Sequence, residues 1–195
     1  MECATEAVVS FALEFQAQFG ESLCLVVHGS DADPHTWHEM LWTAGHVWTL
    51  ELRLASTDAA AQPLHYHYCV VATGSAATAA PDEASVHRCE DAEHALCVPH
   101  AGVARAAVRD WWGVGGPARC TVLAVRHPLH AAHELRLVVP RFFGHWRCDN
   151  AACAAGRHRL CRAWDCDQYR CDACDFDLCP VCALGGGGGS ETAEL

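Results

Sequence analysis

The sequence contains no lysine: all 13 of its basic residues are arginine, against 24 aspartate and glutamate residues. The net charge of −11 argues against nucleic acid as a partner, because binding to phosphates needs clustered positive charge. No apolar run approaches the roughly 18 residues that a membrane-spanning helix needs, so we expect no membrane partner. The first residues lack the basic region that precedes the apolar stretch of a secretory signal. We therefore expect a cytoplasmic protein.

Cysteine, in contrast, is abundant and unevenly distributed. Of the 14 cysteines, six are scattered over the first 120 residues and eight lie between Cys148 and Cys182. In a chain without a secretory signal, this density is typical of metal sites. The segment from Cys148 onward is therefore the first candidate for a functional site.

The region before residue 113 is predicted to be β-structure. Short apolar runs with a period of two recur, for example at 9–15, 48–54 and 65–71, between segments rich in Gly, Pro, Asp and Ala. This pattern favours a mainly β fold, an antiparallel β-sandwich. The predicted divisions are a β-sandwich at 1–113, a Gly-rich hinge at 114–118, a small zinc-stabilised cross-brace domain at 119–184 and a flexible tail at 185–195.

Two Cys-x2-Cys pairs lie four residues apart: Cys171 with Cys174, and Cys179 with Cys182. Such a pair presents two thiolates to one ion, and zinc takes four tetrahedral sulfur or nitrogen ligands. Because the two pairs are too close together to share one compact site, each needs partners from elsewhere, in a cross-brace. We predict two zinc ions rather than disulfides, since nothing indicates an oxidising compartment. The available partners are Cys148, Cys153 and two of His127, His130 and His133.

The segment YRCDACDFDLCPVC at 169–182 resembles the core of ZZ-type zinc fingers, and HPLHAAHEL at 127–135 resembles plant C1-like domains. ZZ fingers take two histidines from beyond the last cysteine, but none follows Cys182, so the C1-like arrangement supplies them from upstream. An extra pair, Cys161 and Cys166, has no place in either pattern and is an alternative partner for a Cys-x2-Cys pair. The resemblance thus implies one zinc ion on Cys148, Cys153, Cys179 and Cys182, and a second on Cys171, Cys174, His130 and His133.

Aspartates crowd the same segment. They either make it soluble and support the metal ligands, or they form an acidic pocket, as in the ZZ fingers that this segment resembles. That resemblance implies a peptide or protein partner with a cationic amino terminus. The candidate peptide-binding residues are Asp172, Asp175 and Asp177.

The N-terminal region resembles the family-20 starch-binding module, an immunoglobulin-like sandwich. The matched pieces, in order, are FGESLCLVVHGS, VWTLELRL, LHYHYCVV, CEDAEHALCVP and the closing VRDWW at 108–112. The resemblance implies an α-glucan partner. The implied sugar-binding residues are Trp48 as a stacking surface, His67 and Glu90 at its edge, and Phe19 with Trp42 at a second site.

Two observations weaken this sugar site. The second stacking tryptophan of the family falls on Cys89, so we expect glucan binding to be weak or lost. Trp48 is also in phase with Leu50, Leu52 and Leu54, which equally favours a position in the hydrophobic core.

No spacing in the sequence brings together a nucleophile and a base, and each predicted zinc ion has four protein ligands, so we expect no enzyme. The sequence predicts a non-enzymatic adaptor or targeting protein that combines a starch- or glycogen-binding-like module with a zinc finger for a peptide or protein. The alternative is the substrate-recognition portion of a larger ubiquitin-pathway or other regulatory enzyme, with a degenerate sugar site.

Overall fold

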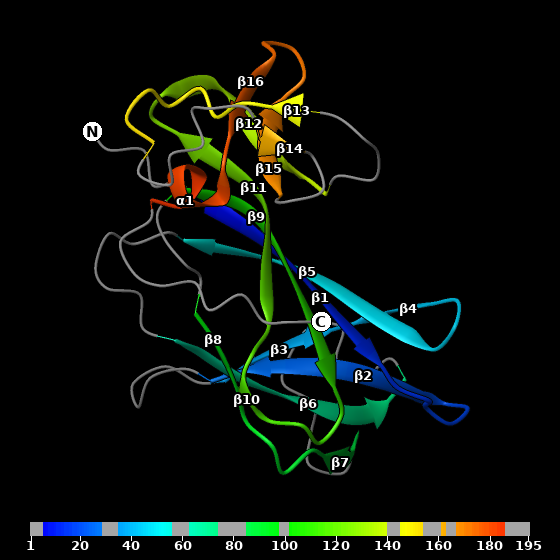
Figure 1. Cartoon of the computed structure of the whole chain (residues 1–195). Helices are drawn as coiled ribbons and strands as arrows, with labels where there is room; N and C mark the ends of the chain where they lie inside the picture. The colour runs from blue at the N-terminus through cyan, green and yellow to red at the C-terminus, as the bar shows by residue number, and fades with distance from the viewer. Residues whose placement is uncertain are drawn as a thin grey trace. The chain divides into compact units, whose positions relative to one another are not determined.

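The computed structural model describes residues 6–28, 35–55, 63–73, 85–97, 102–139, 145–153, 161–162 and 167–185. These residues form sixteen β-strands and one short α-helix, which confirms the predicted mainly β fold (Figure 1). The chain divides into two compact units, residues 1–98 with 106–121, and residues 99–105 with 122–195. In the described part of the chain, no helix is long and apolar enough to cross a membrane.

The first unit is a sandwich of two sheets. One sheet has the strand order β9-β1-β5-β4, and the other has the order β10-β8-β6-β2-β3, with β7 paired to β6. Their bounds are β1 Glu6–Glu14, β2 Glu21–Val27, β3 Thr36–Glu39, β4 Leu41–Thr43, β5 Val47–Ala55, β6 Leu64–Ala72, β7 Val86–Cys89, β8 His94–Leu96, β9 Val103–Trp111 and β10 Gly116–Pro117.

The alternation of side chains along β1 explains its place in the core. Ala7, Val9, Phe11 and Leu13 are buried, and the residues between them face outward. Strand β1 pairs antiparallel with β5 over its whole length. The Phe11 ring meets the Tyr66 ring of the other sheet edge to face, with 5.2 Å between ring centroids. Aromatic and aliphatic side chains from both sheets thus share one core.

Residues 114–118, predicted as a hinge, are instead bound to strand β8. The Gly116 amide donates to the Glu93 carbonyl at 2.8 Å, and the Ala118 amide donates to the Ala95 carbonyl at 2.8 Å. A Cβ on Gly115 would lie 2.7 Å from the Glu93 carbonyl oxygen. Glycine is therefore required here for close approach of two backbones rather than for flexibility. The compact units divide later, between residues 121 and 122.

The second unit is a small β-structure that carries the clustered cysteines. Within it the strand order is β16-β15-β12-β11, and β13 pairs with β14 separately. Leu135, Tyr169 and Leu178 are buried, and the Tyr169 hydroxyl donates to the Val122 carbonyl at 3.0 Å. The bounds are β11 Cys120–His127, β12 His130–Val138, β13 His145–Trp146, β14 Cys161–Arg162, β15 Gln168–Cys171, β16 Phe176–Leu178 and α1 Pro180–Ala183. The predicted tail, apart from Gly185, lies outside the described residues.

Candidate functional site

The first candidate metal centre consists of Cys148, Cys153, Cys179 and Cys182. Their four sulfur atoms lie within 4.8 Å of one another, and all four residues are buried. Cys148 and Cys153 follow strand β13, Cys179 immediately precedes helix α1, and Cys182 lies within that helix. Residues from two parts of the chain therefore converge on one point.

The geometry of this group fits a tetrahedral zinc ion. The Cys153 and Cys179 Sγ atoms are 3.7 Å apart. Two thiolates about 2.3 Å from one tetrahedral zinc ion lie about 3.8 Å apart, so the sulfurs are already spaced as ligands of one ion. The Cys179 amide donates to Cys148 Sγ at 3.5 Å, and Asn150 Nδ2 donates to Cys182 Sγ at 3.4 Å. Such donors stabilise negative charge on ligand sulfurs and fix their orientation.

Burial has a further consequence for these thiols. It raises the pKa of Cys182 to about 11 and also raises the pKa of Cys179. Without a cation, both side chains would be neutral thiols at pH 7, whereas a bound metal ion favours the thiolate. The four sulfurs thus form a donor set suited to a soft divalent cation.

The second candidate metal centre consists of His130, His133, Cys171 and Cys174, whose donor atoms also lie within 4.8 Å of one another. The two histidines are on β12, Cys171 ends β15, and Cys174 lies in the turn that follows. Cys174 Sγ is 3.3 Å from His133 Nδ1. The His130 ring stacks on Phe176 with 4.7 Å between centroids.

A buried polar atom supports a ligand at this second group. His130 Nε2 is buried and has no hydrogen-bond partner. A buried ring nitrogen without a partner is costly, and coordination of a metal ion would satisfy it. Because Cys174 is exposed while every cysteine of the first group is buried, this second centre is the more accessible of the two.

The two groups are interleaved along the chain, as a cross-brace requires. The order is a histidine pair, a cysteine pair of the other group, then Cys171 with Cys174, then the last pair. The structure thus brings together the eight residues that the sequence predicted, in the two predicted sets. His127 belongs to neither group, and its Nδ1 accepts from the Leu129 amide at 3.1 Å. Cys166 and the side chain of Cys161 lie outside the described residues.

The six cysteines of these groups are free thiols in the structure rather than disulfides. Among the described residues there is one disulfide elsewhere, which the sequence did not predict. It joins Cys69 on β6 to Cys89 on β7, in the first unit. The donor atoms of Cys69, Cys89 and His67 lie close enough together to hold a metal ion. Because the two sulfurs are bonded to each other, only His67 remains as a donor in that group.

The predicted acidic pocket is occupied by an arginine of the chain itself. Arg170 Nε is 3.2 Å from Asp172, and Arg170 Nη1 is 2.7 Å from Asp177. Arg170 also pairs with Asp175. The three aspartates predicted to receive a cationic amino terminus therefore already share one internal cation.

The predicted main sugar site is not assembled, because two of its residues are buried. Trp48 is only 6% exposed, and its indole Nε1 donates to the Phe15 carbonyl at 3.0 Å. A buried ring offers no face to a sugar, so the phase of Trp48 with the leucines of β5 predicted its position correctly. The stacking role implied by the resemblance is wrong for this residue.

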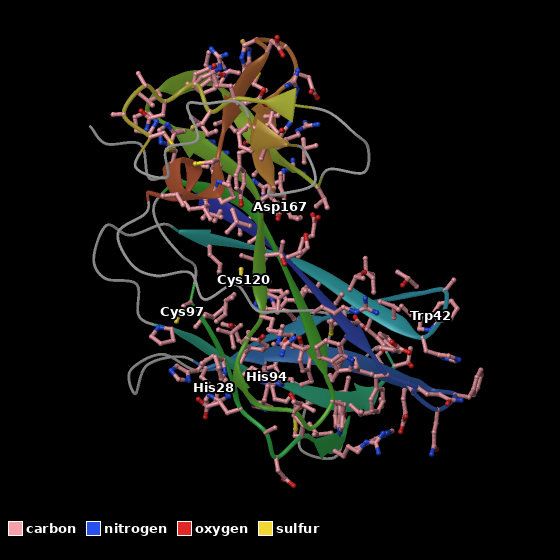
Figure 2. All side chains as sticks on the ribbon, in the orientation of Figure 1. His28, Trp42, His94, Cys97, Cys120 and Asp167 are labelled. Atoms are coloured by element: carbon pink, nitrogen blue, oxygen red, sulfur yellow. A yellow bond between two sulfur atoms is a disulfide. The ribbon has the colours of Figure 1, made fainter. Side chains whose placement is uncertain are left out.

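Glu90 is also a structural residue. Its carboxylate accepts from the Tyr68 amide at 2.8 Å and from the Gly113 amide at 2.9 Å. The His94 side chain, labelled in Figure 2, is 2% exposed, and its Nε2 lies 2.9 Å from the same carboxylate. The Tyr66 and Tyr68 hydroxyls both donate to Asp110 nearby, at 2.6 and 2.8 Å. The carboxylate that was predicted to bind sugar is thus already hydrogen-bonded within a buried polar network.

His67 and Phe19 have different surroundings. His67 Nδ1 lies 2.6 Å from His28 Nε2, and burial together with His28 lowers the pKa of His67. Phe19, in the turn between β1 and β2, is fully exposed. Trp42, on β4, is also exposed, so of the five predicted sugar-binding residues Phe19 and Trp42 present accessible aromatic surfaces.

Comparison with known proteins gives little more. No protein-family model and no curated protein matches the chain. Among solved structures, it is similar to a glycoside hydrolase family 15 glucoamylase from Hypocrea jecorina, with 19% identity and a TM-score of 0.42. The similarity covers 58% of this chain and spans only 18% of the glucoamylase chain. It is too weak to assign a family.

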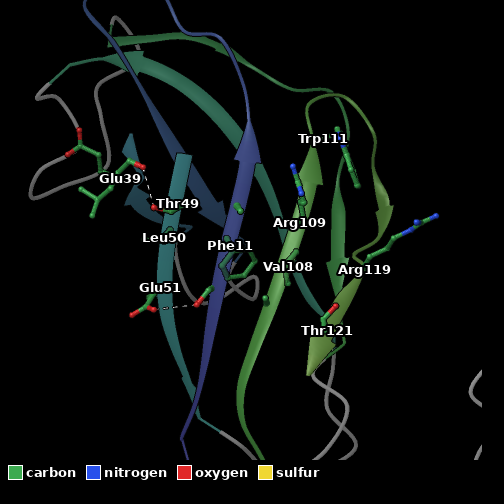
Figure 3. Close-up of a pocket in the computed structure, with 14 residues that line it drawn as sticks. Phe11, Glu39, Thr49, Leu50, Glu51, Val108, Arg109, Trp111, Arg119 and Thr121 are labelled. Atoms are coloured by element: carbon green, nitrogen blue, oxygen red, sulfur yellow. Dashed lines mark hydrogen bonds between the residues drawn. The ribbon is translucent and has the colours of Figure 1, made fainter. Parts of the chain in front are cut away.

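One further feature, a groove on the outer face of the β9-β1-β5-β4 sheet, was not predicted from the sequence (Figure 3). Its volume is about 1010 Å³. The only signal that could have indicated it is the run of small residues at alternate positions, Ser10 and Ala12 on β1. Such a run is common on any exposed strand and does not by itself indicate a site.

Proposed function

We propose that this chain is a non-catalytic binding protein whose second unit is built on two structural zinc ions and whose sandwich binds an α-glucan. The observation that carries the zinc part is the pair of four-residue donor sets described above. Each set has the sulfur and nitrogen donors of a structural zinc site and supplies all four ligands from the protein. Such a site has no open position for a substrate or a water, so its role is to hold the fold.

In this proposal, zinc adds to the small hydrophobic core of the unit, formed by Leu135, Tyr169 and Leu178, because a core of that size contributes only a few kcal/mol. When bound, the ion supplies folding free energy, about 10 kcal/mol or more in isolated modules. Cys148 and Cys153 would thereby be fixed to helix α1, and His130 and His133 to the turn after β15. The protein residues around them orient the sulfurs and exclude water from the first centre.

Zinc content tests this part directly. Native mass spectrometry of the purified protein should find two zinc ions per chain. Cys148→Ser and Cys171→Ser should each reduce the content to one, because each removes one ligand from a different set. A wild-type protein without zinc, or one with a disulfide among these cysteines, would rule the proposal out.

The glucan part is supported by the sandwich fold and by the sequence resemblance of its strands to the family-20 module. The same resemblance predicts weak binding, since Cys89 replaces a stacking tryptophan and is bonded to Cys69. Sedimentation of the protein with insoluble starch, compared with cellulose, tests whether the sandwich retains any glucan affinity.

A peptide or protein partner for the zinc unit is a second, separate proposal. It rests on Asp172, Asp175 and Asp177, which are held together around Arg170. A peptide with a free, basic amino terminus would have to replace the Arg170 guanidinium. Binding should therefore be weak in the wild type and should weaken further as salt is raised.

A further inference from the structure

The groove on the outer face of the first sheet has a floor of small side chains. The pairing registers place Leu41 opposite Thr49 and Thr49 opposite Ala12. Ser10 is two residues before Ala12 on the same face, and Ala107 of β9 lines the groove beside them. Four adjacent strands span about 14 Å at the usual inter-strand spacing. A trough runs over these strands and extends past Trp111 of β9 to Arg119 and Thr121 (Figure 3).

The walls of the trough are apolar at two points. Leu41 on β4 is 72% exposed, and Trp111 at the end of β9 is 48% exposed. A half-exposed indole at the side of a groove offers a flat surface with a polar edge, on which the apolar face of a sugar ring can stack. Both residues lie in the same compact unit as the floor.

The polar groups of the trough carry no net charge. Arg109 and Arg119 line it together with Glu39 and Glu51, two cations against two anions. The hydroxyls of Ser10, Thr49 and Thr121 lie among them. Such a lining offers both donors and acceptors but attracts neither polyanions nor polycations. The matching ligand is neutral and rich in hydroxyl groups.

An extended peptide fits this position less well. Peptides that bind to sheets add a strand at a free edge, where their backbone groups complete the ladder. The floor strands β1 and β5 each have a neighbour on both sides, so the trough presents side chains instead of backbone groups. The amides of a peptide lying there would be left with few partners, whereas sugar hydroxyls can pair with the carboxylates, guanidinium groups and hydroxyls.

We propose that this trough binds a neutral oligosaccharide, with Trp111 as the stacking surface and Glu51, Arg109 and Arg119 as hydrogen-bonding groups. Its volume of about 1010 Å³ is that of a site for a short chain rather than for one sugar. The proposal rests on the glucan part of the proposed function and gives it a location other than Trp48, Glu90 or Phe19.

Titration calorimetry of the full chain with maltoheptaose, cellohexaose and chitohexaose tests the proposal. The wild type should bind at least one of them. Trp111→Ala should weaken that binding about 10-fold, the upper range for one aromatic contact. Ala12→Gln, which fills the floor without removing any contact, should weaken it as well. Arg53→Ala is the control: it is on the same face of β5 but outside the trough, and should bind as the wild type does.

The outcomes separate the two proposals. If binding is lost in Phe19→Ala but unchanged in Trp111→Ala and Ala12→Gln, the glucan function stands and the trough is not its site. If circular dichroism shows that the wild type is folded and it binds none of the three oligosaccharides, both are wrong. Equal binding by all variants would likewise overturn the proposal that the trough binds sugar. Loss in both trough variants, with retention in Arg53→Ala, supports it.

Discussion

Replacing Glu90 by alanine distinguishes between its two assigned roles. The family resemblance implies that Glu90 binds sugar, whereas the structure indicates that its carboxylate stabilises the fold. In the structure the carboxylate accepts from the Tyr68 and Gly113 amides and contacts His94. The alanine variant leaves the buried Tyr68 amide and the buried His94 ring without this acceptor, at about 1–3 kcal/mol each, whereas the more exposed Gly113 amide can bind water instead. Allowing for partial relaxation, we expect unfolding free energy to fall by about 3–5 kcal/mol, the range for breaking a buried charged network.

This loss is large against the roughly 5–15 kcal/mol that keeps a domain folded. Urea unfolding of the full chain with zinc present, followed by tryptophan fluorescence, measures it as a lower midpoint at unchanged slope. Glu93→Ala is the matched control, because Glu93 is half exposed and contacts only His65 among the charged groups of the described structure. An exposed pair of this kind contributes at most about 1 kcal/mol. A Glu90→Ala protein as stable as the Glu93→Ala protein would refute the structural role.

Three further predictions concern the metal centres, the buried histidine and the aspartates. A chelator should remove zinc first from the group with exposed Cys174 and later from the buried four-cysteine group. Mass spectrometry over time measures this order, and simultaneous loss of both ions would contradict it. Burial lowers the pKa of His94, but Glu90 and Asp110 together outweigh it, so the pKa is raised on folding. Its stabilisation is then complete below the unfolded pKa of about 6.5 and lost as pH rises through the folded value. Unfolding free energy should fall over that window, and His94→Gln should flatten the profile; an identical profile in the variant would show that another group titrates. Arg170→Ala should strengthen binding of a peptide with a free basic amino terminus, measured by fluorescence anisotropy, and acetylating that terminus should abolish it. Equal affinity with and without the acetyl group would mean that the aspartates only solubilise.

The metal ligands could be predicted from the sequence because their geometry is mostly local. A Cys-x2-Cys spacing by itself places two sulfurs on one ion, as with Cys179 and Cys182. The choice of partners was harder, since His130 and His133 are about 40 residues from Cys171. The resemblance to known fingers supplied that pairing, and the structure assembles the same sets.

The sugar site shows the opposite case. The resemblance assigned Trp48 and Glu90 by position along the strands, but burial depends on what covers a side chain. Glu90 is 22 residues from Tyr68 and 23 from Gly113 in sequence, yet it binds the amides of both. No local pattern shows that these partners will meet inside the sandwich. Periodicity did predict the burial of Trp48, because side chains on one face of a strand share its environment.

The sequence alone determined the features that depend on spacing and alternation: a mainly β chain, strands with one buried face, and two Cys-x2-Cys pairs of metal-ligand type. Tertiary structure decided the features that depend on pairing between distant strands. The segment predicted as a hinge forms strand β10, because glycine there lets its backbone approach the backbone of strand β8 closely. The trough exists because strand register places Leu41, Thr49 and Ala12 in one row. Register is set by packing of the whole sandwich, since a shift of one residue would turn every side chain to the other face.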